Sequence, residues 1–131
     1  MKAWVFTIAA VAALMPASSF AHHSLGSYNR SIYLVAEGTV KSFEWSNPHV
    51  QLEVMIVDHN GVAKLWRFEG GSISQLALNG FTKGIVAPGD KIKVQYNPKR
   101  TGANGGLFLG ITTPDGRNHN VERLALFKPG D

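Results

Sequence analysis

The stretch HVQLEVMIVDHNGVAKLWRFE, residues 49–69, carries the clearest structural signal in the chain. In its first half every second residue is apolar, which is the period of a β-strand with one buried face. Asn60-Gly61 follows and suits the positive φ angles of a type I′ turn. In the second half Trp66 and Phe68 share one face. The stretch therefore predicts a β-hairpin whose inner face belongs to a core.

Further strand and helix signals flank this hairpin. Residues 33–45 predict a long strand with Gly38 as a bend or bulge point. Residues 72–80 change to a helical period, with Ser72 as N-cap and Gly80 beyond the C-cap. Two more strands are expected over 91–96 and 107–112, and the tail "VERLALF" predicts a last strand or short helix.

Three strands, one short helix and two strands are the element order of a small Greek-key barrel of the OB type. A lipocalin-like meander would lack the helix, and a sandwich would need more strands. We therefore expect a mainly β fold, a five-stranded OB-like barrel with one short helix between strands 3 and 4.

The first 21 residues have the features of an export signal. Lys2 precedes the apolar run 3–15, and Ser19 and Ala21 are small residues at the positions that a signal peptidase reads. The alternative, an uncleaved anchor, would need about 20 apolar residues to span a membrane. We expect cleavage after Ala21, a single barrel domain over 22–131, and a periplasmic or secreted location.

Composition narrows the chemistry of the chain. It has no cysteine, which excludes disulfides, thiolate zinc sites and cysteine nucleophiles. The net charge of +4 is spread along the chain, so it permits polyanionic partners without requiring them. No serine lies in a G-x-S-x-G elbow, and no pair of carboxylates has a telling spacing. The sequence does not favour an enzyme.

The expected mature chain begins His22-His23-Ser24. The new α-amine and the imidazole of His22 would form a chelate that a remote histidine completes in a T-shaped Cu(II) site. His23 offers a rival geometry through the amine, the intervening amide and its own imidazole. Zinc or nickel are alternatives to copper. Equally, a histidine start can be no more than an easily processed terminus.

Candidate remote ligands are His49, His59 and His119, all at strand ends or turns. Trp45 and His49 flank an Asn-Pro turn, which would suit an aromatic platform beside an imidazole. The structural alternative is that Trp45 caps the barrel and Asn47 bonds its own backbone ahead of the proline.

Two charged segments have functional and structural readings. Arg67 and Glu69 face away from the core, where a cross-strand ion pair is expected in preference to a general base. Lys99 and Arg100 precede a glycine-rich loop in the position of the binding loop between strands 4 and 5 of OB barrels. That loop could hold an anion through its backbone amides, or it could be a mobile hairpin tip.

Several motifs occur together along the chain: AHHS at 21–24, WSNPH at 45–49, WRFE at 66–69 and PGD at 88–90. In this order they resemble a family of small exported bacterial proteins of unknown function. The resemblance implies no established activity. It does imply that the His-His start recurs with the motif at His49.

The sequence thus supports an exported, non-enzymatic binding module with a metal site formed by His22, His23 and His49. The alternative is a metal-free module that docks an envelope or secreted partner through Trp45, Lys99 and Arg100. A third reading is polyanion binding, the common use of OB barrels. Export argues against nucleic acid as its partner.

Overall fold

The computed structural model describes residues 25–121, so His22, His23 and all but the first residue of the predicted tail segment lie outside the described residues. Its elements begin with η1, a single 3-10 turn, and include six strands and one α-helix. They are η1 (Leu25–Ser27), β1 (Leu34–Glu44), β2 (Gln51–Val57), β3 (Ala63–Glu69), α1 (Ile73–Leu78), β4 (Lys91–Pro98), β5 (Gly105–Thr112) and β6 (Asn118–Asn120).

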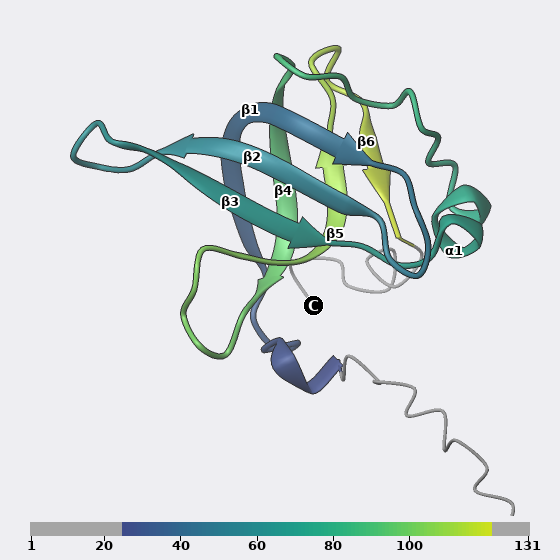
Figure 1. Ribbon diagram of the computed structural model, residues 1–131, viewed down its shortest axis with the longest axis horizontal. Coiled ribbons are helices and arrows are strands. Elements are labelled where there is room, and N and C mark those ends of the chain that lie inside the picture. The colour runs from purple at the N-terminus through teal and green to yellow at the C-terminus, as the bar shows by residue number, and fades with distance from the viewer. Residues whose placement is uncertain (1–24, 122–131) are drawn as a thin grey trace, which may run out of the picture.

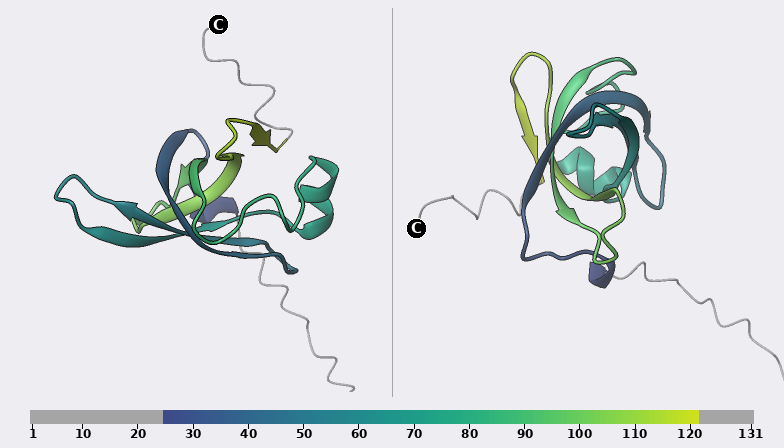
Figure 2. Two further views of the ribbon diagram at one scale, coloured as in Figure 1. Left: turned by 90° about the horizontal axis from the view of Figure 1, so that it is seen from above. Right: turned by 90° about the vertical axis from the view of Figure 1, so that its left-hand side faces the viewer.

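Strands β1 to β5 form a closed OB-like barrel, as the sequence predicts. The strand order is β3-β2-β1-β4-β5-β6, and a parallel pairing of β3 with β5 closes the ring. Figure 1 shows the strands crossing with α1 at one end, and the right panel of Figure 2 shows them curling around a common axis. The topology with one helix between β3 and β4 is the Greek-key arrangement expected of this class.

The β2–β3 hairpin pairs over its full length, from Gln51 opposite Glu69 to Val57 opposite Ala63. The predicted type I′ turn is wrong. Gly61 has a φ of 79°, but no residue other than glycine has a positive φ among residues 25–121. The turn is instead organised by Asp58, whose carboxylate accepts the backbone N–H groups of Asn60 and Val62.

Strand β1 serves two neighbours, which is why it is long. Its first half pairs with β4 and its second half with β2. The bulge that allows this lies between Val40 and Ser42, not at Gly38 where the sequence placed it. Gly38 is required for another reason: a Cβ there would lie 2.4 Å from the carbonyl oxygen of Met55.

The core fills the barrel with inward-facing residues of all five strands and closes at one end with α1. Leu76 of the helix and Phe81 after it are buried. Ser72 caps α1 in a capping box with Gln75, and Gly80 follows the C-cap with a φ of 81°, both as predicted in position. The largest fully buried side chains are Phe68, Phe81, Phe108, Leu52, Leu76, Ile111, Val50, Val54 and Val94.

Strand β6 is a feature that the sequence did not reveal. A turn at 114–116 precedes it, and Gly116 adopts a φ of 82° there. The polar residues after it have no alternation to mark a strand, yet they pair with the open edge of β5, His119 opposite Ile111. Within the described part of the chain, no helix is both long and apolar enough to cross a membrane.

Candidate functional site

A cluster of three polar side chains lies on the outer surface of the barrel where β2 begins and β3 ends. His49 precedes β2, and Glu69 is the last residue of β3. The Tyr28 hydroxyl donates a 2.6 Å hydrogen bond to Oε2 of Glu69. The other carboxylate oxygen, Oε1, lies 2.5 Å from Nδ1 of His49. The cluster therefore joins three segments that are far apart in sequence.

The contact with Glu69 determines the chemistry of the His49 ring. A carboxylate at Nδ1 favours the tautomer with its hydrogen on that nitrogen, which makes Nε2 the basic nitrogen of the neutral ring. Metal-ligating histidines in proteins commonly have this arrangement, because the carboxylate orients the ring and raises its basicity. The side chains of His49 and Glu69 are 33% and 19% exposed, so the pair remains within reach of solvent.

Tyr28 is the deeply placed member of the cluster. It is 7% exposed. Burial raises the pKa of the Tyr28 hydroxyl far above its ordinary value, and the hydrogen bond to Glu69 and that carboxylate's charge raise it further. The hydroxyl is thus a neutral donor throughout the physiological range, and its bond to the carboxylate is charge-assisted.

The segment around Tyr28 is fixed to the start of the β4–β5 loop. Asn29 N–H donates to the Pro98 carbonyl at 2.8 Å, and Arg100 N–H donates to the Ser27 carbonyl at 3.0 Å. The Arg100 guanidinium adds a 2.8 Å bond from Nε to the Gly26 carbonyl. The predicted anion-binding residue Arg100 thus contacts the backbone of the N-terminal segment.

Lys99 forms an isolated β-bridge with Tyr28 and is half-buried. Further along, Gly105 has a packing role: its φ is 120°, and a Cβ there would overlap the Arg67 carbonyl. The absence of a side chain at Gly105 permits β5 to approach β3 and close the barrel.

The turn that carries His49 is held by its neighbours. Asn47 Oδ1 accepts the backbone N–H of Ile73 at 3.0 Å, which ties the turn to the first residue of α1. Trp45 is half-buried, packs against the core, and its ring centroid lies 5.8 Å from that of Phe43. Trp45 thus has the packing role of its structural alternative. Asn47 does not bond its own backbone as that alternative predicts, because its side chain bonds the backbone of α1. His49 is the residue of this turn whose side chain contacts Glu69.

The outer face of β1, β2 and β3 continues beyond the cluster with paired charges. Arg67 Nε lies 2.8 Å from Glu53 Oε1, which is a cross-strand ion pair, although its carboxylate is Glu53 and not Glu69. Ser42 and Lys41 also contact Glu53.

The remaining predicted ligands do not join His49 in a compact set. His59 is exposed in the β2–β3 turn, and His119 of β6 lies against the ring of Phe81, 6.1 Å between centroids. Over residues 25–121 no three His, Cys, Asp or Glu side chains are grouped so that they could hold a metal ion. His22 and His23 lie outside that range, so the predicted site is not tested by it.

Sequence reasoning missed the roles of Glu69 and Tyr28. The hairpin register offered a usable signal: pairing around the turn puts Glu69 opposite Gln51, two residues from His49 on the same outward face. Tyr28 offered none, because its position depends on the loop between β4 and β5.

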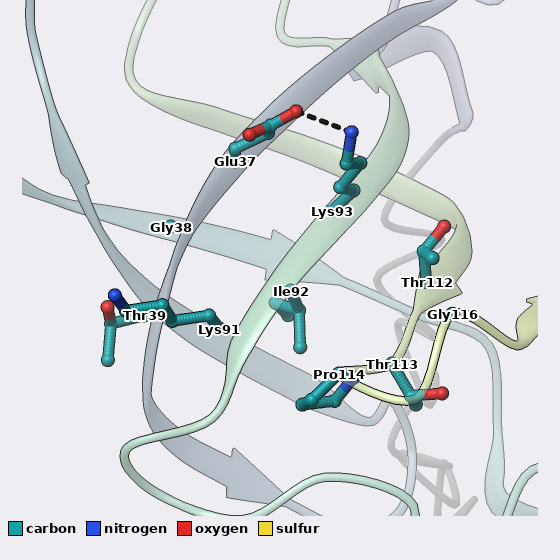
Figure 3. Close-up of a pocket in the computed structure, with 10 residues that line it drawn as sticks. All are labelled: Glu37, Gly38, Thr39, Lys91, Ile92, Lys93, Thr112, Thr113, Pro114 and Gly116. Carbon is teal, nitrogen blue, oxygen red and sulfur yellow. Dashed lines mark ion pairs between the residues drawn. The ribbon is translucent and has the colours of Figure 1, made fainter.

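A shallow hollow lies elsewhere on the barrel, between β1, β4 and the β5–β6 turn. Its volume is about 460 Å³. Figure 3 shows the ion pair of Glu37 with Lys93, 2.8 Å apart, near one end, and Thr113 and Pro114 near the other. Of the predicted site residues that the structure describes, none lines it.

Comparisons with known proteins place the chain in a family. The model of DUF6152, a family of unknown function, matches residues 9–108, and the chain belongs to this family. A small single-stranded DNA-binding protein from Streptomyces coelicolor is similar in structure, with 22% identity, a TM-score of 0.43 and coverage of 66% of this chain and 94% of that chain. No curated protein matches the sequence.

Proposed function

We propose that this member of DUF6152 is an exported, non-enzymatic binding module that holds a divalent metal, Cu(II) by preference, between its mature N-terminus and His49. The observation that supports the proposal is the 2.5 Å contact of His49 Nδ1 with Glu69. It is the kind of carboxylate contact that orients a ligating imidazole in metal sites of other proteins.

The donor set would be nitrogen alone. The His22 amine and imidazole would supply two ligands, and His49 the third, a set that suits Cu(II) and is shared with zinc and nickel. The rival geometry through His23 would use the same amine. The tether is short, because His22 lies only six positions before Tyr28 in the sequence. Tyr28 in turn contacts the carboxylate that holds His49.

The test is a calorimetric Cu(II) titration of protein whose first residue has been confirmed as His22 by mass spectrometry, which also checks the expected cleavage. We expect one equivalent to bind, and His49→Ala to weaken it about 10- to 100-fold. His59→Ala is the matched control and should bind as the unaltered protein does. A single alanine added before His22 should remove the terminal chelate. Undiminished affinity in that extended protein would contradict the proposal.

A second candidate function is metal-free docking of an envelope or secreted partner. One observation favours it: Ile32, Tyr33, Leu34 and Val35 are four consecutive apolar residues with 42–60% of their surface exposed. Along Leu34–Gly38, β1 has β4 as its ladder partner, while its pairing with β2 starts at Thr39. An extended partner segment could add to this edge.

Docking at the edge is tested by site-specific photo-crosslinking in the cell. A crosslinker at Val35 should give one discrete adduct, and the control position Val57, which is also exposed, should not. Equal adducts from both positions would indicate nonspecific contact.

Polyanion binding has less support from this surface. The outer face of β2 and β3, which OB barrels use for oligonucleotides, carries Glu53 and Glu69, and Arg67 is already paired there. Arg100 of the loop is bonded to the N-terminal segment. We therefore expect no salt-sensitive binding of heparin or DNA, and a binding assay at two salt concentrations would test this.

A further inference from the structure

We propose that Tyr28 is a positioning residue which, through Glu69, couples the docking of the N-terminal segment 25–29 to the state of His49. The proposal rests on the proposed function for its metal-binding consequence, while the coupling itself involves only described residues. It concerns regulation of the same site. A change in the bonding of His49 would alter how firmly segment 25–29, which leads to the expected mature terminus, is held on the barrel.

The first step is that one carboxylate serves two donors. Tyr28 donates to Oε2, and His49 Nδ1 contacts Oε1, so any rotation of the Glu69 carboxylate to suit one partner moves the oxygen that faces the other. Glu69 also belongs to a ladder with Gln51 on one side and Leu107 on the other, which holds its backbone. The backbone of Glu69 is therefore fixed by the sheet, while its two carboxylate oxygens are shared between Tyr28 and His49.

The second step is that the segment is otherwise attached to a different part of the barrel. Its backbone bonds run to Pro98 and Arg100, at the end of β4 and in the loop after it. Figure 1 shows η1 beside this loop, below the barrel. The Tyr28 side chain connects this segment to β3, and through Glu69 to the residue that precedes β2.

The third step is the direction of the coupling. A ligand that binds Nε2 of His49 makes its Nδ1–H a stronger donor, which holds the Glu69 carboxylate in the orientation that Tyr28 also uses. Removing the imidazole leaves the carboxylate with one side-chain donor and more freedom to turn toward water. Tyr28 would then be held less firmly, and segment 25–29 would open more often.

The coupling is tested without metal by amide hydrogen exchange of the full mature chain. The reporters are the Asn29 and Arg100 N–H groups, which close the segment onto the loop. We expect exchange at both to rise roughly tenfold in Tyr28→Phe, and also to rise, by a smaller factor, in His49→Ala. Glu53→Gln is the matched control, since Glu53 is also an outer-face carboxylate and accepts hydrogen bonds from two side chains. It should leave these two amides unchanged.

A metal titration then separates the two proposals. We expect Tyr28→Phe to weaken Cu(II) binding about 5- to 10-fold without altering the stoichiometry, and Cu(II) to slow exchange at Asn29 in the unaltered protein. If His49→Ala leaves both reporter amides unchanged, the coupling is wrong even where Cu(II) binds tightly. If Cu(II) does not bind while His49→Ala still speeds exchange, the metal function fails and the coupling stands. Unchanged Cu(II) affinity in Tyr28→Phe overturns the positioning role.

Discussion

The side-chain oxygen Oδ1 of Asn47 accepts the backbone N–H of Ile73, so the turn carrying His49 is fastened to the start of α1 across 26 residues of sequence. Val50 adds two backbone bonds beside it, one from its N–H to the Gly71 carbonyl and one from Gly70 to its own carbonyl. The position of the imidazole thus depends on the end of the barrel that α1 closes.

Asn47→Ala should therefore destabilise the protein. The change removes an acceptor from the first N–H of α1, and we expect a loss of about 1 kcal/mol in the free energy of unfolding. Urea denaturation followed by tryptophan fluorescence measures it. Asn104→Ala, at an exposed loop position, is the control and should be nearly neutral. An equal loss in both variants would contradict the assigned role.

The close approach of β5 to β3 makes Gly105 intolerant of a side chain. A Cβ would meet the Arg67 carbonyl, and the φ of 120° is itself unfavourable for other residues. We expect Gly105→Ala to cost at least about 3 kcal/mol or to prevent folding. Gly84→Ala is the matched control, because no atom lies within 4 Å of the added Cβ. Circular dichroism melts of the two variants should differ by well over 10 °C.

Acid should weaken the ion pair on the outer face. The hydrogen bonds from Arg67 and Ser42 lower the pKa of Glu53 below its ordinary value of 4.5. A lowered pKa in the folded state means that this contribution to stability is present above pH 4.5 and is lost as the pH falls toward the lowered value. The difference in Tm between the unaltered protein and Glu53→Gln should shrink over that interval. A difference that stayed constant from pH 6 to pH 2 would be inconsistent with the pairing.

Alkali should act on Tyr28. Its pKa is raised by burial and by Glu69, so above the ordinary value of 10.0 the unfolded chain loses this proton before the folded chain does. Stability is complete below pH 10 and falls as the pH rises beyond it. Tyr28→Phe should reduce the slope of that fall between pH 10 and 12. Absorbance of phenolate at 295 nm, recorded alongside the melts, would show whether the hydroxyl titrates with unfolding.

Much of the fold follows from local chemistry. The alternation in 49–69 predicts both strands of the hairpin, because burial of one face requires a two-residue period. Ser72 and Gly80 mark the ends of α1 through capping and a left-handed backbone, which are local requirements. By contrast, β6 exists because the edge of β5 is available, and the bulge in β1 depends on the demands of two neighbouring strands.

The sequence by itself determined the class of the barrel, the order of its elements and the outward direction of His49 and Glu69, since each depends on periodicity over a few residues. Only the tertiary structure decided that His49, Glu69 and Tyr28 meet, and that Arg100 contacts the N-terminal segment. Those contacts join residues 20 to 74 positions apart. They arise from barrel closure and loop packing, and neither of these produces a periodic pattern of residues from which it could be predicted.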